Sequence, residues 1–323
     1  MKPTESKPSW RNWGDHPFVV LISAIASLIT IIAFLTGKSA IASLLGASTQ
    51  VSTNTLSAIR TSQPTTTNAP SPTQTAILPE LTLGIGSTTM GKDDMTLLYV
   101  PAGEFTMGSD YGIFDELPIH VVNLDSFWVD QTEVTNARYA LCVKDGGCKM
   151  PDFSKSYARD IYYGNSEFDN YPVIYVSWDD AKAYCSWAGR RLLTEAEWEK
   201  AARDDSGRIY PWGNNTPNDN LLNYDQNVGD TTEVGKYPNG TSLYGALDIA
   251  GNVWEWVADW YDTYYVSSST SNPLGPASGT YRVLRGGSWN DKVNDVRSAN
   301  RLRYIPANTN INIGFRCAVS ATP

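Results

Sequence analysis

The chain has 323 residues, of which 41% are hydrophobic, enough to bury the core of one large domain or two ordinary ones. Its net charge of −9 argues against nucleic acid as a partner, because phosphate backbones are bound by basic surfaces. Its two histidines, His16 and His120, exclude a multi-histidine zinc or iron centre within the chain. The 11 tryptophans and 18 tyrosines suit a fold with little regular structure, in which large rings fill irregular gaps.

An apolar segment near the N-terminus predicts a membrane anchor. Residues 18–36 (FVVLISAIASLITIIAFLT) carry no charge and, at about 1.5 Å per residue, span roughly the 30 Å hydrocarbon core as a helix. Trp10 and Trp13 precede this helix as interfacial aromatic residues do, and the basic residues favour a cytoplasmic segment 1–17. The alternative is a cleaved signal peptide with a site near Ala42. Both alternatives export the remainder of the chain.

Residues 37–92 predict a flexible linker. Between residues 48 and 79, Thr, Ser and Pro dominate, and charged and aromatic residues are scarce. Such a segment cannot bury enough apolar surface to order itself. We therefore expect a spacer between the membrane and a globular domain at residues 93–320.

The globular domain begins with short strands and continues with long loops. Apolar runs at 97–100 and 121–124 are bounded by Pro, Gly and Asp, as short strands are. Between Arg203 and Arg282 the chain consists mostly of Gly, Asn, Asp, Pro and aromatic residues, which predicts ordered loops. Ordered loops of this length need metals, disulfides or aromatic packing to fix them.

Three capping residues predict helices in this domain. A short helix is expected after Thr135, and a longer one runs from Ser177 to Gly189 with one apolar face. Thr194 and Glu197 form the capping box of the third helix. The acidic residues of this third helix are expected to cap it or to face solvent (Glu195, Glu197 and Glu199).

The four cysteines all lie in the predicted exported domain, where disulfides are stable. Cys142 and Cys148 flank turn-forming residues (CVKDGGC), which indicates a small local bridge. Cys185 and Cys317 would then pair across a long loop, a closure worth roughly 5 kcal/mol in the chain-entropy model. The alternative is a redox or metal-binding thiol pair. Two observations argue against it: the sequence has no C-x-x-C motif, and Cys185 lies on the apolar face of its helix.

Seven motifs occur between residues 95 and 320: VPAGEFTMGS (100–109), FWVDQTEVTNARYALCV (127–143), YPVIYVSWDDAKAYCSWAGRRLLTEAEWEKAAR (171–203), YPWGN (210–214), LYGALDIAGNVWEWVADWY (243–261), LRGGSWN (284–290) and NIGFRCA (312–318). Together and in this order they resemble the formylglycine-generating enzyme family, also called sulfatase-modifying factor domains. The resemblance implies an α+β fold with little regular structure, which is a variant of the C-type lectin fold. It also implies a long-range disulfide between Cys185 and Cys317.

The resemblance implies an oxidase chemistry for which this chain lacks the reactive residues. Enzymes of the family oxidise a cysteine of an unfolded sulfatase with oxygen, and two active-site cysteines bind Cu(I) and engage the substrate thiol. Those cysteines follow the GGS-aromatic motif by two and seven residues, and the matching positions after Trp289 are Asp291 and Val296. Neither side chain is a soft ligand for Cu(I) or a nucleophilic sulfur. We therefore expect neither copper binding nor formylglycine generation.

The resemblance also implies structural calcium. Calcium prefers oxygen atoms of carboxylates, amides and backbone carbonyls. Asn252 and Glu255 match one calcium site of the family, and Asn223, the carbonyl of Tyr224 and Asp230 match a second. The alternative is that Asn252 and Glu255 only cap backbone groups of a loop.

The C-terminal stretch predicts a binding surface, because this segment lines the substrate site of the family's enzymes. Amides and aromatic rings make adaptable contacts, as they do in paratopes. The predicted contact residues are Trp289, Asn290, Asp291, Asn294, Asp295, Asn300, Leu302, Tyr304, Asn308 and Asn310. The stretch looks like the variable region of proteins that retroelements diversify on the same scaffold. The alternative is that ordinary members of the family are also rich in Asn here.

The sequence therefore predicts a single-pass protein of the cell membrane whose domain outside the cell binds a protein or a glycan. The rival hypothesis is an enzyme, either related to formylglycine generation or catalysing another cysteine-free reaction. A third hypothesis is a scaffold component of the cell envelope.

Overall fold

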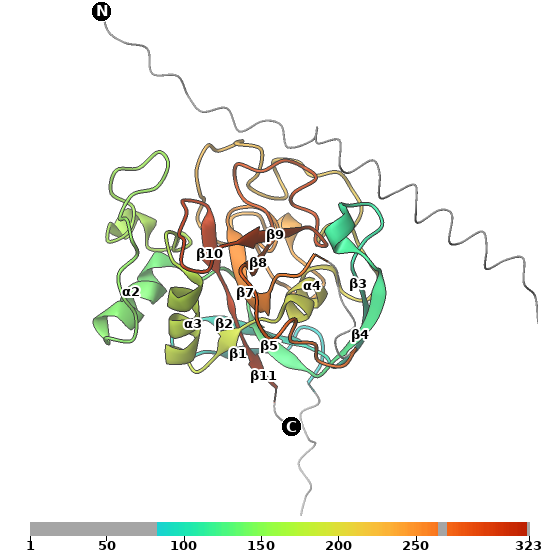
Figure 1. Cartoon of the computed structure of the whole chain (residues 1–323). Helices are drawn as coiled ribbons and strands as arrows, with labels where there is room; N and C mark the ends of the chain where they lie inside the picture. Colours follow the sequence, from blue (N-terminus) through green and yellow to red (C-terminus); the bar gives the residue numbers. More distant parts are fainter. Residues whose placement is uncertain (1–82, 264–269, 322–323) are drawn as a thin grey trace, which may run out of the picture. The chain divides into compact units, whose positions relative to one another are not determined.

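The computed structural model describes residues 83–263 and 270–321 (Figure 1). The chain divides into two units, residues 1–75 and 76–323, and the described residues belong to the second. The predicted segments 1–17 and 18–36 and most of the predicted linker lie outside the described residues. Within the described ranges, no helix has the length and apolarity needed to cross a bilayer.

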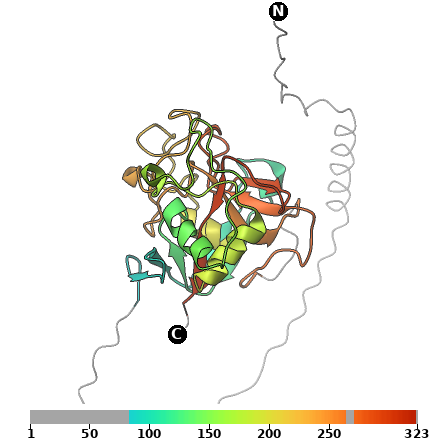
Figure 2. The same cartoon turned by 90° about the vertical axis from the view of Figure 1, so that its left-hand side faces the viewer.

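The three α-helices in the described part of the chain begin where their capping residues predict. Their bounds are α2 Asn136–Lys144, α3 Trp178–Trp187 and α4 Glu195–Arg203. The hydroxyl oxygens of Thr135, Ser177 and Thr194 accept hydrogen bonds from the backbone N–H three residues later, at 3.4, 3.2 and 3.2 Å. Helices α3 and α4, which follow Ser177 and Thr194, have complete capping boxes. Figure 2 shows α2 and α3 side by side.

A five-stranded antiparallel sheet joins the two ends of the folded unit. Its order is β1 (Thr88–Met90), β2 (Thr96–Val100), β5 (Phe127–Asp130), β11 (Cys317–Ser320) and β6 (Arg191–Leu192). The predicted strand at 97–100 is thus confirmed as β2. Because β1 pairs with β2, the folded unit extends upstream of the predicted boundary at residue 93. The last strand, β11, lies between β5 and β6, so the end of the domain closes on its beginning.

A second sheet and a two-stranded ribbon complete the unit. The sheet has the order β10 (Ile313–Phe315), β7 (Trp254–Trp260), β8 (Arg282–Arg285) and β9 (Arg301–Tyr304), with β10 parallel to β7. The ribbon pairs β3 (Gly103–Met107) with β4 (His120–Leu124), which confirms the strand predicted at 121–124. Short 3-10 helices occur at Phe114–Glu116, Ser166–Phe168 and Pro238–Gly240.

Strand β7 corrects the expectation of loops throughout 204–281. Its residues Trp254 to Val257 are all buried, so both faces of the strand pack against protein and the period-2 alternation of a half-exposed strand is lacking. Between α4 and β7, where every residue is described, the chain follows the prediction and forms only the 3-10 helix at 238–240.

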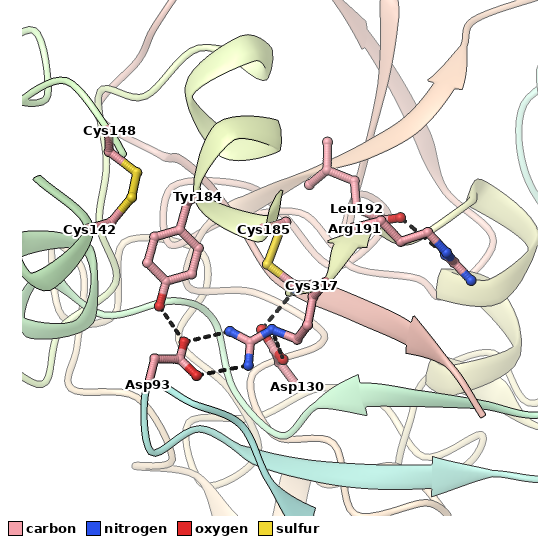
Figure 3. Close-up of a disulfide and its surroundings, with 10 residues drawn as sticks. Asp93, Asp130, Cys142, Cys148, Tyr184, Cys185, Arg191, Leu192 and Cys317 are labelled. Carbon is pink, nitrogen blue, oxygen red and sulfur yellow. Dashed lines mark hydrogen bonds and ion pairs between the residues drawn. A yellow bond between two sulfur atoms is a disulfide. The ribbon is translucent and has the colours of Figure 1, made fainter. Parts of the chain in front are cut away.

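The two predicted disulfides are present: one closes a local loop after α2, and the other ties α3 to the first sheet. Cys142 pairs with Cys148 just beyond α2, and Cys185 of α3 pairs with Cys317 of β11. Figure 3 shows the second bond beside a chain of buried polar groups. In this chain the Tyr184 hydroxyl donates to Asp93 at 2.5 Å, and Asp93 accepts from Arg190 at 2.8 Å.

Glu197 caps α4 as predicted, but none of the three acidic residues of this helix faces solvent, which corrects the other part of the expectation. Glu195, Glu197 and Glu199 are buried, and each pairs with an arginine. Glu195 accepts from Arg301 at 2.6 Å, Glu197 from Arg191 at 2.6 Å, and Glu199 forms an ion pair with Arg285. The partner arginines lie on β6, β8 and β9. The helical periodicity of α4 alone therefore could not predict these ion pairs.

Candidate functional site

A compact polar cluster forms where the turn after β8 meets the start of β10. Ser288 donates through its hydroxyl to Asp291, and the indole N–H of Trp254 donates to the same Asp291 oxygen at 2.8 Å. The side-chain amide of Asn312 donates to Ser288 Oγ and to Asn290 Oδ1, both at 3.0 Å. We call these five residues, Ser288, Asn290, Asp291, Asn312 and Trp254, the polar cluster.

Glycine shapes the turn that carries this cluster. Gly287 has φ +73°, and a Cβ atom there would lie 2.7 Å from Val296 Cγ1 and 2.9 Å from the Asp295 carbonyl. A side chain at this position is therefore excluded by both conformation and space. The tight turn brings Ser288 back over Asp291.

The two positions that match the family's cysteines differ in accessibility. Asp291 is half-buried on the surface of the cluster, whereas Val296 is fully buried against Gly287. Burial raises the pKa of Asp291, and the negative charge of Asp295 adds to this effect. Hydrogen bonds from Ser288 and Trp254 work in the opposite direction. The side chain can thus hold a proton more readily than an ordinary aspartate.

Beside the polar cluster lies an aromatic pair. Trp289 is buried, and its ring packs against Tyr157 with centroids 5.3 Å apart. Tyr157 is 66% exposed, so the pair presents one ring to solvent. The indole N–H of Trp289 has no hydrogen-bond partner among the described residues.

The other predicted contact residues fall into two groups. Within the turn after the cluster, Asn294 is exposed, whereas Asn300 is buried and donates to the Asp295 carbonyl at 2.8 Å. The second group lies on β9 and the loop beyond it (Leu302, Tyr304, Asn308 and Asn310), where the Asn310 amide lies 3.5 Å from the Tyr304 hydroxyl. Asn300 therefore supports the turn, while the exposed members can meet a ligand.

The sequence analysis did not predict a second surface beside this C-terminal stretch, at residues 150–161, which we call the apolar wall. Residues 150–161 carry four exposed apolar side chains: Met150, Phe153, Tyr157 and Ile161. Asp152 accepts from the Thr309 hydroxyl at 2.8 Å, and Phe153 packs on Tyr175 with centroids 4.9 Å apart. The signal in the sequence was the apolar content of a loop otherwise rich in Ser and Asp.

The residues predicted to bind calcium lie close together. Asn223 donates to the Asp230 carbonyl at 2.9 Å and to Asn252 Oδ1 at 3.2 Å. Asn223 Oδ1 is buried and has no partner in the described part of the chain. The carbonyl of Tyr224 accepts from Asn227 N–H at 2.9 Å, and the Asp230 carboxylate accepts from Ser156 at 2.6 Å. Asn223 therefore supplies an oxygen of the kind calcium needs, whereas Asp230 is already engaged by donors.

Glu255 lies in a buried group of carboxylates with Glu133 and Asp248. The sequence analysis named Glu255 but not the other two. Glu255 pairs with Arg316 at 2.8 Å, and Glu133 accepts from the Asn252 amide at 2.8 Å. Burial raises the pKa of Glu133 well above its ordinary value, and the charges of Asp248 and Glu255 raise it further against the effect of Arg316. Burial likewise raises the pKa of Asp248 to about 6. Over the described ranges, no three His, Cys, Asp or Glu side chains converge as metal ligands do.

Copper does not fit the sulfur atoms of this chain. All four cysteines of the sequence are consumed in the two disulfides. Cu(I) prefers thiolates, and a disulfide sulfur carries no thiolate charge.

The fold is a mixed α/β domain that two disulfides stabilise. Its irregular C-terminal segment carries a polar surface that has no free thiol. Residues 87–321 match the family described as "Sulfatase-modifying factor enzyme 1-like domain", and the chain belongs to this family. It is 36% identical to the formylglycine-generating enzyme of Streptomyces coelicolor over 287 residues, which cover 69% of this chain and 88% of that enzyme.

The solved structures that resemble the domain include PvdO and a variable protein. PvdO from Pseudomonas aeruginosa is 28% identical, with a TM-score of 0.63 over 73% of this chain and 99% of that one. The Treponema denticola variable protein 1 is 25% identical, with a TM-score of 0.60 over 72% of this chain and 98% of that one. These likenesses support the fold that the sequence motifs implied.

Proposed function

We propose that this protein is a membrane-anchored, exported binding module that uses the C-terminal surface of its sulfatase-modifying-factor domain. Residues 18–36 anchor it in the cell membrane, and residues 289–312 bind a protein or a glycan outside the cell. The single observation that carries the proposal is the replacement of reactive sulfur by Asp291, together with the engagement of all four cysteines in disulfides.

The chemistry of the surface supports binding. Exposed Asn290 and Asn294 offer both donors and acceptors, and the ring of Tyr157 offers an exposed stacking face beside them. Polar groups that surround an exposed ring suit a sugar or a peptide, since both present apolar faces edged by hydrogen-bonding groups. The apolar wall at residues 150–161 enlarges the surface.

A glycan array and a peptide library, probed with the full chain, test this proposal. We expect a ligand whose binding is weakened about tenfold by Asn290→Ala combined with Tyr157→Ala, because each removes an exposed contact. The matched control is Asn215→Ala, which changes an exposed asparagine of another loop. Equal losses for the control, or no ligand in either screen, would contradict the proposal.

The second candidate function is an enzyme, and the raised pKa of the half-buried Asp291 is the observation that favours it. Incubation of the protein with copper and a Cys-x-Pro-x-Arg peptide distinguishes the two candidates. The binding module leaves the cysteine unchanged, whereas formylglycine in the product would establish the oxidase.

Retroelement diversification of residues 290–312 would explain their polar composition. At the nucleotide level, this hypothesis requires a near-copy of the coding stretch for residues 284–318 that differs chiefly at adenines, with a reverse transcriptase gene nearby. Lack of both beside the gene would remove this version of the proposal and leave the binding surface itself unaffected.

A further inference from the structure

A groove lies where the described part of the chain both begins and ends. Its volume is about 1000 Å3, at the upper end of the range for ligand pockets. Leu83, with which the described residues begin, and Ala321, with which they end, both line it. The chain therefore enters the described domain at this groove.

Apolar side chains form much of the lining. Leu124 of β4, Trp178 of α3 and Leu192 of β6 are at most 7% exposed. Leu83 and Leu274, which also line the groove, are 42% and 73% exposed. Exposed leucines beside a concave surface still have apolar area to bury when a partner binds. The lining thus favours an apolar occupant.

The charged residues of the groove leave one cation without a carboxylate partner. The four that line it are Asp125, Lys182, Arg191 and Glu197. Arg191 and Glu197 form an ion pair at 2.6 Å, and the Asp125 carboxylate is engaged by the side-chain amide of Asn272 at 2.9 Å. Lys182 Nζ lies 5.2 Å from the centre of the Trp178 ring and forms no ion pair among the residues that the structure describes. An occupant that brings one carboxylate to Lys182 would therefore complement the groove.

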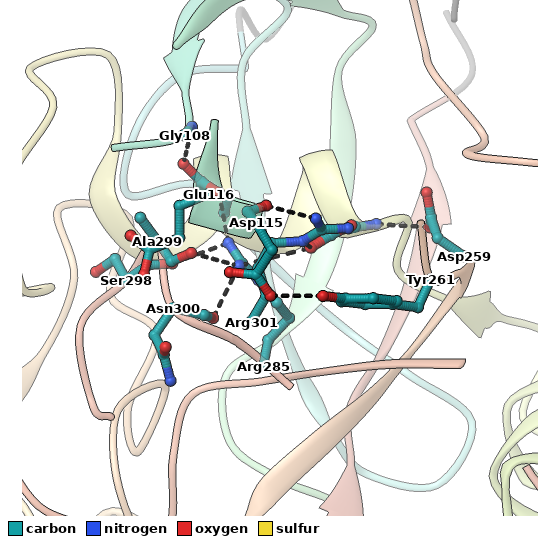
Figure 4. A network of polar contacts seen from close by, with 12 residues as sticks. Gly108, Asp115, Glu116, Asp259, Tyr261, Arg285, Ser298, Ala299, Asn300 and Arg301 are labelled. Atoms are coloured by element: carbon teal, nitrogen blue, oxygen red, sulfur yellow. Dashed lines mark hydrogen bonds and ion pairs between the residues drawn. The ribbon is translucent and has the colours of Figure 1, made fainter. Parts of the chain in front are cut away.

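The exposed apolar side chains of the loop between β3 and β4 cannot fill this groove in their own domain. Glu116 accepts two hydrogen bonds from Arg297, at 2.7 and 2.5 Å, and the Asp115 carbonyl accepts from Arg301 at 2.7 Å. Figure 4 shows Asp115 and Glu116 pointing inward, so the loop is fixed where it is. It joins β4 at the end opposite Leu124, which is roughly 14 Å away by the rise of an antiparallel strand. An occupant from the same chain must therefore come from another segment.

The segment that directly precedes Leu83 has the matching chemistry. Residues 77–81 read Ile-Leu-Pro-Glu-Leu and lie outside the described residues. They combine three large apolar side chains with one carboxylate, that of Glu80. Residues 61–75 just upstream contain no charged residue and, apart from alanine and proline, no apolar one. The family match starts at residue 87, so this segment is not part of the domain that the family shares.

We propose that residues 77–81 dock into this groove of their own domain, with the Glu80 carboxylate beside Lys182. Leu81 precedes Leu83 by two residues and Ile77 precedes it by six, so a fully extended chain keeps them within roughly 7 and 22 Å of it. So short a tether gives the segment an effective concentration in the millimolar range, and weak contacts are then sufficient for docking. The spacer of the predicted membrane anchor then ends near residue 76. This inference goes beyond ligand binding at residues 289–312 and does not depend on it.

Disulfide trapping in the full chain tests the docking. The four native cysteines are paired, so Leu78→Cys and Leu274→Cys introduce the only two free thiols. Equilibration with glutathione measures their effective concentration, which we expect to be about tenfold higher than that of a control pair. The control combines Leu274→Cys with Gln74→Cys, which the same tether can bring to the groove but which lies upstream of the apolar segment. A 78–274 bond no more favourable than the control, or one that joins two chains, would overturn the proposal.

Charge reversal provides the second measurement. Lys182→Glu, added to the chain with the 78–274 pair, places two carboxylates together and should lower the effective concentration about tenfold. Glu80→Lys in the same chain should then restore most of it, because the opposite charges meet again. The matched control is Lys236→Glu, which changes an exposed lysine outside the groove and should have no effect. Equal losses for Lys182→Glu and Lys236→Glu, or no recovery with Glu80→Lys, would show that Glu80 does not meet Lys182 and would overturn the proposal.

Discussion

Arginine side chains determine how the interior of this domain is held together. Arg316 is fully buried, and its guanidinium group contacts both oxygens of Glu255 at 2.8–2.9 Å and the carbonyl of Leu247 at 2.8 Å. Arg285 likewise contacts the carbonyls of Ala299 and Asn300, both at 2.8 Å. Planar guanidinium groups with several fixed donors suit this role, because they satisfy carboxylates and loop carbonyls at the same time.

Loss of Arg316 should lower the free energy of unfolding far more than loss of a partly exposed arginine. Arg316→Met leaves Glu255 buried without its charge partner, and we expect the free energy of unfolding to fall by about 3–5 kcal/mol. Arg191→Met is the matched control, since its side chain is 41% exposed and the expected loss is about 1 kcal/mol or less. Urea unfolding of both variants measures the difference. Equal losses would show that Glu255 does not depend on Arg316.

Asp259 should make the domain less stable as the pH rises. Burial, reinforced by the charges of Glu195 and Glu197 and opposed by Arg301, raises the pKa of Asp259 to about 8. Between about pH 4 and pH 8 the native state therefore holds a proton that the unfolded chain has released. Below this window Asp259 takes nothing from the free energy of unfolding. Within it, the free energy of unfolding decreases by up to about 1.4 kcal/mol for each pH unit.

Asp259→Asn tests this dependence, because the amide oxygen can still accept the Glu195 N–H that now lies at 2.7 Å. We expect the variant to show a shallower decrease in stability between pH 5 and pH 8, as measured by urea unfolding at several pH values. If the two pH profiles are parallel, Asp259 does not hold the additional proton.

At the scale of elements, helix α4 connects local capping with long-range ion pairs. Thr194 accepts from Glu197 N–H at 3.2 Å, and Glu197 in turn accepts from Thr194 N–H at 2.9 Å. We expect Thr194→Ala to lower the free energy of unfolding by about 1 kcal/mol, because the Glu197 N–H at the helix start loses the hydroxyl oxygen that accepts its hydrogen bond. Thr280→Ala, at an exposed loop position, should change it by less than about 0.5 kcal/mol. Thermal unfolding of the two variants provides the comparison.

Local and non-local elements differ in how far the sequence predicts them. The three helix starts were predictable, since Thr135, Ser177 and Thr194 lie within three residues of the N–H groups that they cap. The parallel pairing of β10 with β7 was not predictable, because nothing near Ile313 indicates that Trp254 is its partner. The same limit applies to the candidate site. The motifs identified residues 284–312, but only the folded chain brings Trp254 and Tyr157 to them.

At the scale of the whole molecule, the two disulfides should contribute unequally. Their cysteines are 6 and 132 residues apart, and in the chain-entropy model these closures stabilise the native state by about 2 and about 5 kcal/mol. Replacement of Cys185 and Cys317 by alanine should therefore destabilise the domain more than replacement of Cys142 and Cys148. Guanidinium unfolding of the two double variants measures this order, and a reversed order would mean that packing around α2 outweighs chain entropy.

Calcium would act at the same scale, because the residues around Asn223 join segments far apart in the chain. Asn252 contacts Glu133 at 2.8 Å and Thr232 N–H at 2.9 Å, so the irregular stretch after α4 is fixed to the segment before α2. We propose that a calcium ion, bound in part by the buried Asn223 oxygen, reinforces this connection. Calcium at 100 times its dissociation constant would stabilise the domain by about 2.7 kcal/mol.

We therefore expect the melting temperature of the EDTA-treated protein to rise with added calcium and to rise much less with magnesium, which demands a stricter octahedral geometry. Asn223→Ala should abolish this rise, whereas Asn215→Ala, at an exposed position of another loop, should preserve it. A melting temperature that does not respond to millimolar calcium would mean that the hydrogen bonds of Asn223 and Asn252 fix the stretch on their own. In that case the amides act as caps for loop backbone, and the aromatic and arginine contacts of the interior suffice to hold a long segment that has little regular structure.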